Sequence, residues 1–334
     1  MKKIVILLLL LAYTFCLQAQ EDHSRAETLL YQAVEVERNG ASLEQLGELY
    51  TQIAQIDPEY PNVYYAWSLS IAIKAKENKD ENLYKQSFEK IQKAIEIDSA
   101  YVEAYHLWGI YLAEYAYMKK DSNLFEESIS KFHKAIEIRP EYVESYCLWA
   151  GFLAEYAKFK DYDLSLFQQS FDVFRKTEEI APGSENVNIL WGSVLTQLAD
   201  KKNDTKLYKE SIEKYNKALE KGTNPIDANN GKGYSYMQLG KAENNLLKYK
   251  SQIESSFHIA EEKQSQSAAY NLACFYSLIK EKDKALLWLE RTITRNYGLK
   301  INEFGKQKIE KDSDFDNIRK EKRYKEIMNQ YFSK

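Results

Sequence analysis

Four tryptophans at an almost constant spacing constrain the fold of this chain more than any other feature. Trp67, Trp108, Trp149 and Trp191 are separated by 41, 41 and 42 residues. The sequence that leads into each tryptophan also repeats, as IDPEYPNVYYAW, IDSAYVEAYHLW, IRPEYVESYCLW and IAPGSENVNILW. A period of this length is typical of stacked repeat architectures, in which each unit buries its apolar face only against the next unit.

Each copy contains two stripes of apolar or small residues with helical spacing. In the copy around Trp108 these are Tyr105, Trp108 and Leu112 on the first stripe and Ser128, Phe132 and Ala135 on the second. Between them lies KKDSN, which combines a cationic helix end with side chains that cap a following helix. The chain has only 12 Gly and 5 Pro, too few for a turn-rich β-sandwich of 334 residues. We therefore predict a pair of antiparallel helices in each copy.

This pattern resembles the tetratricopeptide repeat, a 34-residue helical hairpin. The family has two large residues and a small one in its first helix, which correspond here to Tyr105, Trp108 and Gly109. Its second helix has a small residue, an aromatic, an alanine and a proline, which correspond to Ser128, Phe132, Ala135 and Pro140. The resemblance implies an all-α, right-handed superhelical solenoid of antiparallel helix hairpins.

The copies depart from the family in their length. Copies two to five are seven or eight residues longer than the usual unit, and the extra residues fall between the two helices, as in segment 117–121. We interpret them as about two extra helical turns shared across each hairpin. Weaker copies precede and follow these: an opening copy at 24–58, a sixth at 224–264 without the extra turns, and a seventh at 267–297. The apolar stripe of Asp312–Phe332 predicts a C-terminal capping helix. We thus divide the mature chain into 20–223, with the lengthened repeats, and 224–334, with the shorter ones.

Residues 1–19 have the pattern of a secretory signal peptide. Lys2 and Lys3 precede an unbroken apolar run, and the small residue Ala19 follows it. Two alternatives are an uncleaved anchor and lipidation at Cys16, although Phe15 stands where a lipidation motif needs a small residue. No later stretch is apolar enough to cross a bilayer. We predict an exported protein of the periplasm or envelope of a bacterium.

Several classes of function lack the residues they need. A formal net charge of −4 disfavours a nucleic-acid binder. The chain has four histidines and no metal-binding or phosphate-binding motif, so we predict no enzyme, no cofactor and no metal site. Cys147 and Cys274 lie within helical apolar patterns, and we expect two buried, unpaired thiols.

Proteins that resemble this family usually bind partner segments on the concave face lined by the first helices. The corresponding residues are Tyr65, Leu69 and Ile73 in copy two, His106, Ile110 and Glu114 in copy three, Cys147, Gly151 and Glu155 in copy four, and Ile189, Ser193 and Gln197 in copy five. The surface is partly apolar and mildly acidic. It would suit a peptide with apolar anchors and a basic residue near Glu114 and Glu155.

The leading hypothesis is therefore an exported scaffold or adaptor that binds a protein or peptide partner. Three other hypotheses remain. The first is a carbohydrate- or small-ligand-binding envelope protein, because the chain contains 26 Tyr. The second is an enzyme, and the third is a structural oligomer whose open stack ends join head to tail.

Overall fold

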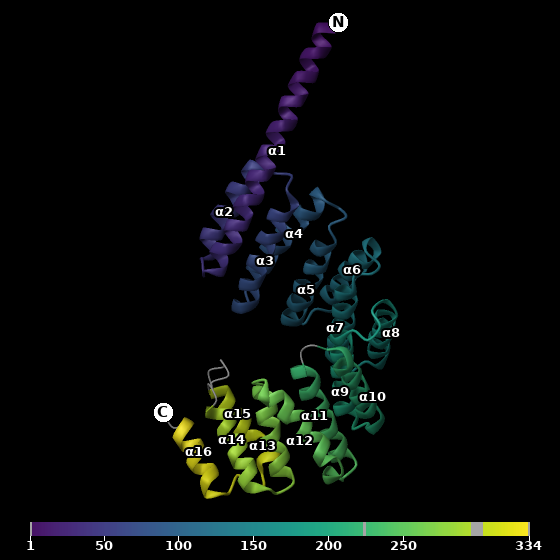
Figure 1. Cartoon of the computed structure of the whole chain (residues 1–334), viewed down its shortest axis with the longest axis vertical. Coiled ribbons are helices and arrows are strands. Elements are labelled where there is room, and N and C mark those ends of the chain that lie inside the picture. Colours follow the sequence, from purple (N-terminus) through teal and green to yellow (C-terminus); the bar gives the residue numbers. More distant parts are fainter. Residues whose placement is uncertain (1, 223–224, 295–302, 333–334) are drawn as a thin grey trace. The chain divides into compact units, whose positions relative to one another are not determined.

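The computed structural model describes residues 2–222, 225–294 and 303–332. α-Helices make up most of these residues, and within these ranges there is no β-strand. The chain divides into two compact units, Met1–Phe167 (unit 1) and Gln168–Lys334 (unit 2). Helix α8 (Leu164–Ile180) contains the division. The prediction of an all-α array of helical hairpins is confirmed (Figure 1).

Unit 1 is a series of antiparallel hairpins. Its helices are α1 (Lys2–Arg38), α2 (Leu43–Ile56), α3 (Pro61–Asn78), α4 (Glu81–Ile97), α5 (Val102–Lys119), α6 (Ser122–Ile138) and α7 (Val143–Phe159). Helices α3 and α4 have 18 and 17 residues, and so do α5 and α6. Helices α13 and α14 of unit 2 have only 13 each, so the long hairpins gain about one turn per helix. This is the lengthening expected from the sequence.

Each long hairpin of unit 1 closes through the same backbone geometry. Helices α3 and α5 are followed by Lys79 and Lys120, whose φ angles of 53° and 55° are left-handed. The next residue is an aspartate that caps the following helix: Asp121 Oδ1 accepts a hydrogen bond of 2.9 Å from the backbone N–H of Asn123. The aspartate satisfies amides that the first helical turn leaves without partners.

Aromatic side chains join consecutive hairpins at equivalent positions. The rings of Tyr84 and Tyr115 lie 5.2 Å apart, and those of Phe125 and Tyr156 lie 4.9 Å apart. Within a hairpin, Phe132 is fully buried against Gly109, where a Cβ atom would approach the ring to 2.9 Å. Small residues therefore allow the close approach of the two helices within a hairpin, and aromatic residues join one hairpin to the next.

Unit 2 continues with further hairpins and a terminal cap. Its elements are α9 (Glu185–Lys202), α10 (Thr205–Lys221), α11 (Pro225–Ala242), the 3-10 helix η1 (Leu246–Tyr249), α12 (Lys250–Glu262), α13 (Gln266–Leu278), α14 (Lys282–Thr294), α15 (Glu303–Lys311), the 3-10 helix η2 (Ser313–Phe315) and α16 (Lys322–Phe332). Phe315, Ile318 and Ile327 are buried, and α16 packs against α14. The predicted cap is present, but η2 and α15 contribute to it as well as α16.

The sixth copy differs from its predicted form, because it does have the extra length. Helix α11 has 18 residues, as many as α3 and α5. Its partner starts as η1 and continues directly into α12, so the second helix is extended by a 3-10 turn rather than by α-helix. The turn is tight, since a Cβ on Gly240 would lie 2.9 Å from the Cα of Leu246. The 3-10 segment has no α-helical periodicity, which concealed the added residues.

Two other sequence expectations can be compared with the structure. Cys147 and Cys274 are buried free thiols, as predicted. Over the residues that the structure describes, none of the helices has the length and continuous apolar character of a membrane span. The first part of α1 coincides with the predicted signal peptide, whose removal remains a prediction.

Candidate functional site

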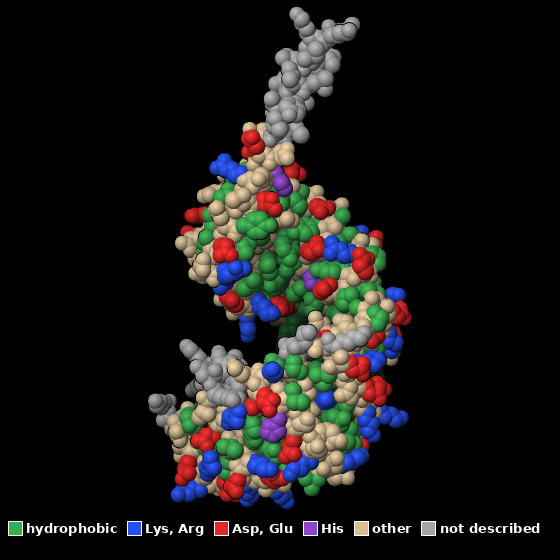
Figure 2. Space-filling view, viewed as in Figure 1, with side chains coloured by type: hydrophobic (Ala, Val, Ile, Leu, Met, Phe, Trp, Pro, Cys, Tyr) green, Lys and Arg blue, Asp and Glu red, His purple; other side chains and the backbone are tan. Residues whose placement is uncertain are grey.

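The first helices of unit 1 present a partly apolar face. Residues spaced four apart share one side of a helix, which places Leu69 with Ile73 on α3 and Ile110 with Glu114 on α5. Leu69 and Ile110 are half-buried, and Ile73 is 38% exposed. In the space-filling view, hydrophobic side chains gather over α3 and α5 (Figure 2).

Two residues expected on this face are largely used in packing. Tyr65 and Leu69 pack against a buried cluster that includes Leu107, and the ring of Tyr65 lies 5.4 Å from that of Tyr101. The face therefore packs on a buried cluster beneath it. Ile73 is the most exposed apolar member of the face, and half-buried Ile110 lies on the next first helix.

His106 is fixed on the same face by neighbours from the next hairpin. Its Nδ1 lies 2.8 Å from Ser145 Oγ, and its ring lies 5.1 Å from that of Tyr142. Burial lowers the pKa of His106 below its usual value, so the ring is neutral at neutral pH. It therefore contributes a hydrogen-bonding group to this face rather than a cation.

Glu114 and Glu155 lie together at the hairpin-turn end of the face. They line a pocket of about 610 Å³, together with the rings of Tyr84, Phe125 and Phe152. We call this cavity the turn-end pocket; its other lining residues are Lys76, Lys79, Ala113, Tyr117, Met118 and Lys120. Tyr84 and Phe125 come from the second helices α4 and α6, which the sequence analysis did not assign to the site.

Both carboxylates of the turn-end pocket already have cationic partners. Glu114 Oε1 forms an ion pair with Lys76 of the preceding hairpin, and Glu155 lies 2.6 Å from Lys158 one turn along α7. The other oxygen of Glu114, Oε2, is buried and has no hydrogen-bond partner among the described residues. Burial, followed by the charge of Glu114, raises the pKa of Tyr84 to about 12, so its hydroxyl stays protonated.

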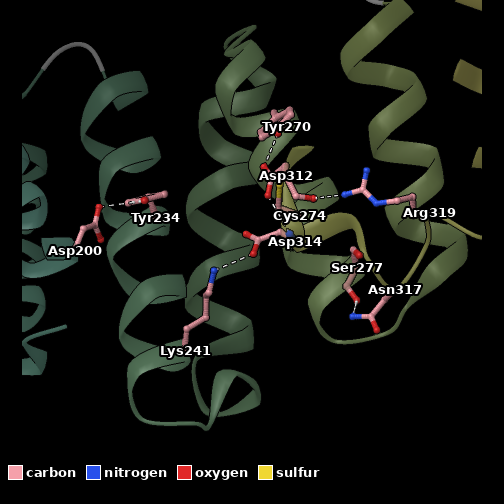
Figure 3. Close-up of polar contacts among 10 residues, drawn as sticks. All are labelled: Asp200, Tyr234, Lys241, Tyr270, Cys274, Ser277, Asp312, Asp314, Asn317 and Arg319. Carbon is pink, nitrogen blue, oxygen red and sulfur yellow. Dashed lines mark hydrogen bonds and ion pairs between the residues drawn. The ribbon is translucent and has the colours of Figure 1, made fainter. Parts of the chain in front are cut away.

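Unit 2 contains a more polar cavity of about 640 Å³, which the sequence analysis did not predict. Asp200 accepts hydrogen bonds from the hydroxyls of Tyr208 (2.7 Å) and Tyr234 (3.1 Å). Across the cavity, Tyr270 donates to Asp312 over 2.5 Å. We call this cavity the polar pocket; it lies where α9, α11 and α13 meet the α15–η2 junction (Figure 3).

Three potential metal ligands meet in the polar pocket: Cys274, Asp312 and Asp314 have ligand atoms within 4.8 Å of one another. The carboxylates are engaged, since Asp312 accepts from Tyr270 and Asp314 pairs with Lys241 over 2.9 Å. Burial raises the pKa of the Cys274 thiol, which disfavours the thiolate that binds metal. A metal would have to displace these partners. The Asp-Ser-Asp sequence after α15 was the available signal, but nothing in the repeat pattern links it to α13.

Comparison with known proteins identifies the fold. No family model and no curated protein matches the chain. Among solved structures, it is similar to yeast Tom70, with 17% identity and a TM-score of 0.52 over 82% of this chain and 55% of Tom70. It is also similar to the human IFIT1 dimer with PPP-AAAA, with 14% identity and a TM-score of 0.53 over 80% of this chain and 58% of IFIT1. The chain thus matches little more than half the length of either protein.

This chain has the tetratricopeptide-repeat (TPR) fold. The likeness shows the architecture and leaves the partner open. Of the residues predicted to line the TPR groove, Ile189, Ser193 and Gln197 lie on α9 in unit 2, and Cys147 and Gly151 lie on α7 in unit 1. Ile189 packs against the cluster of Tyr215 and Ala218, and the Gln197 side chain donates to Ser193 Oγ over 3.3 Å. The candidate site is therefore built from the residues of unit 1.

Proposed function

We propose that this TPR protein is an exported scaffold that binds segments of partner proteins on the first-helix face of unit 1. The observation that carries the proposal is the continuity of that face. Ile73 and Ile110 offer apolar surface, and Glu114 on the same side of α5 lines the turn-end pocket. A partly apolar surface that leads into a preformed pocket is suited to an extended or helical peptide.

Site-specific photocrosslinking in the native cell tests this proposal. A benzophenone amino acid would replace Ile73 or Ile110, and a matched control would replace Gln86, an exposed residue of the second helix α4. We expect the same partner protein to be crosslinked from Ile73 and from Ile110, and not from Gln86. Crosslinks of equal yield from all three positions, or from none, would contradict the binding face.

Export is supported by the charged start and apolar run of residues 1–19. The mass of the protein recovered from the cell envelope tests it. We expect a chain that begins at Gln20, and a Leu8→Asp variant that stays in the cytoplasm at full length. Full-length wild-type protein in the cytoplasm would contradict export.

A second function, binding of a carbohydrate or another small polar ligand, is favoured by the polar pocket alone. Half-buried Tyr234 and Tyr270 stand there beside carboxylate and amide side chains. The tryptophans do not favour it, because a lysine nitrogen lies 3.7 Å from the ring centre of Trp67 and another lies 3.9 Å from that of Trp108. Titration of a glycan panel by calorimetry tests this function. Binding that is lost in Tyr270→Ala would support it, and heat changes absent across the panel would reject it.

A further inference from the structure

The residues that lengthen the repeats also build the turn-end pocket. Tyr117, Met118 and Lys120 belong to segment 117–121, which contains the residues that the usual TPR unit lacks. All three line the cavity. Tyr117 is 63% exposed at its rim, an unusual position for a large aromatic ring. The floor of the pocket is apolar, because it is formed by the side chains of Ala113 and Phe125, which are almost fully buried. The lengthening therefore creates a concave surface as well as a longer hairpin.

One polar atom of a residue that lines the turn-end pocket is buried without a partner. It is Glu114 Oε2, which accepts no hydrogen bond from any residue that the structure describes. A buried acceptor without a donor is costly, and a ligand that supplies one removes that cost. The occupant should therefore have an apolar body with at least one N–H or O–H group.

The charge at the rim indicates what should flank that body. Glu114 and Glu155 are paired with Lys76 and Lys158, so the acidic residues inside are neutralised. Lys79 and Lys120 also line the pocket, and neither forms an ion pair within the described part of the chain. Both are exposed and occupy equivalent turn positions in consecutive hairpins. The uncompensated charge is positive, so the rim favours acidic residues on a partner.

We propose that the turn-end pocket binds a protein segment that inserts a tryptophan or tyrosine side chain flanked by aspartate or glutamate. The ring would contact Phe125 and Phe152. Its N–H or O–H would donate to Glu114 Oε2 after the partly exposed carboxylate turns that oxygen toward the cavity. The flanking carboxylates would lie near Lys79 and Lys120. This inference rests on the proposed scaffold function and names the chemistry of its partner. It replaces the basic residue expected from the sequence, because the structure supplies Lys76 and Lys158 in that role.

Titration of the full chain with short peptides tests the proposal. The probe is acetyl-Asp-Gly-Trp-Gly-Asp-amide, and the methyl NMR signals of Ala113 and Met118 report binding inside the pocket. The matched peptides replace Trp by Phe, which lacks the donor, or both Asp residues by Lys. We expect the Trp–Asp peptide to bind about tenfold more tightly than the Phe peptide, as a hydrogen bond to a charged acceptor allows. The lysine peptide should bind more weakly than either.

Two variants assign the effect to particular side chains. The variant Glu114→Met keeps the length of the side chain but removes the acceptor. In this variant the Trp and Phe peptides should bind with about equal affinity. In the double variant Lys79→Asp, Lys120→Asp, affinity for the Trp–Asp peptide should fall about threefold to tenfold. Aspartate tolerates the left-handed backbone at both positions. Lys280→Asp is the matched control, because Lys280 is exposed with a φ of 62° but lies outside the pocket.

Each alternative result has a definite meaning. Equal binding of the Trp and Phe peptides would overturn the role of Glu114. Tighter binding of the lysine peptide would assign the pocket to a basic segment instead. No shift of the Ala113 and Met118 signals would overturn the occupant altogether. If the crosslinks from Ile73 and Ile110 were still obtained, the scaffold function would stand while this inference failed.

Discussion

At the scale of single residues, short side chains set how closely the two helices of a hairpin approach. Gly109 faces the ring of Phe132, and Ser128 Oγ donates to the backbone oxygen of Gly109 over 2.8 Å. The two helices of this hairpin, α5 and α6, therefore make both a steric contact and a hydrogen bond at Gly109. A repeat position that accepts only small residues is thus explained by a distance rather than by helix propensity.

Gly109→Ala should lower the free energy of unfolding by about 1–3 kcal/mol, because its Cβ would lie 2.9 Å from buried Phe132. Gly47→Ala is the matched control, since Gly47 is also helical but has no atom within 4 Å of a built Cβ. It should raise that free energy by about 0.5–1 kcal/mol through helix propensity. Urea unfolding followed by circular dichroism measures both. Effects of the same sign would show that the approach to Phe132 does not restrict this site.

At the scale of elements, three turns between long helices share a left-handed residue followed by an aspartate. Lys79, Lys120 and Asn203 have φ angles between 53° and 55°, and Asp80, Asp121 and Asp204 follow them. Each aspartate accepts hydrogen bonds from the first turn of its helix. This local geometry recurs in hairpins whose helix faces differ, so it belongs to the turn itself.

Asp121→Ala should lower the free energy of unfolding by about 1 kcal/mol, because the backbone N–H of Asn123 loses its acceptor. Asp121→Asn keeps a side-chain oxygen and should stay within a few tenths of a kcal/mol of wild type. The measurement is again urea unfolding. An equal loss in both variants would indicate that charge, and not capping, is what Asp121 supplies.

An ion pair between neighbouring hairpins should make stability depend on pH. Glu81 of α4 contacts Lys119 of α5 over 2.7 Å and Lys85 over 2.9 Å, and these lysines, Lys119 first, lower its pKa from 4.5 to about 2. A carboxyl whose pKa is lower in the folded state stabilises the fold fully at any pH above its pKa in the unfolded state. It loses this contribution as the pH falls through its pKa in the folded state. The urea midpoint of wild type should therefore exceed that of Glu81→Gln above pH 4.5, and the difference should vanish towards pH 2.

Glu89→Gln on the same helix controls for the loss of one exposed carboxylate. A difference between wild type and Glu81→Gln that persists unchanged down to pH 2 would mean that the pair with Lys119 does not form in solution.

The elements show which parts of the structure a sequence can predict. The hairpins follow from repeated local patterns, so Trp108, Phe132 and their equivalents indicated both the helices and the core. The ion-pair partners could not be predicted in this way, because long lysine side chains such as Lys76 have several carboxylates within reach. The polar pocket joins Cys274 to Asp312 across 38 residues. No repeat relates those two segments, so their meeting depends on how the cap folds.

At the scale of the whole molecule, stacked hairpins contact mainly their neighbours in sequence. The pairs α3 with α4 and α5 with α6 pack along their length, and each hairpin also packs against the next through contacts such as α4 with α5. In such arrays, stability is approximately a sum over repeats and the interfaces between adjacent repeats. A core defect should therefore loosen its own hairpin and the adjoining ones more than distant ones.

Phe132→Ala in unit 1 and Phe257→Ala in unit 2 provide a matched test, since both rings are fully buried second-helix aromatics that face a glycine. Each truncation should cost about 3–5 kcal/mol locally. Hydrogen exchange followed by mass spectrometry should show faster exchange around α5–α7 in the first variant and around α11–α13 in the second. The other unit should keep nearly its wild-type protection. Uniformly faster hydrogen exchange along the whole chain in either variant would mean that the repeats unfold as one cooperative body. A partner bound on unit 1 would then stabilise unit 2 as well.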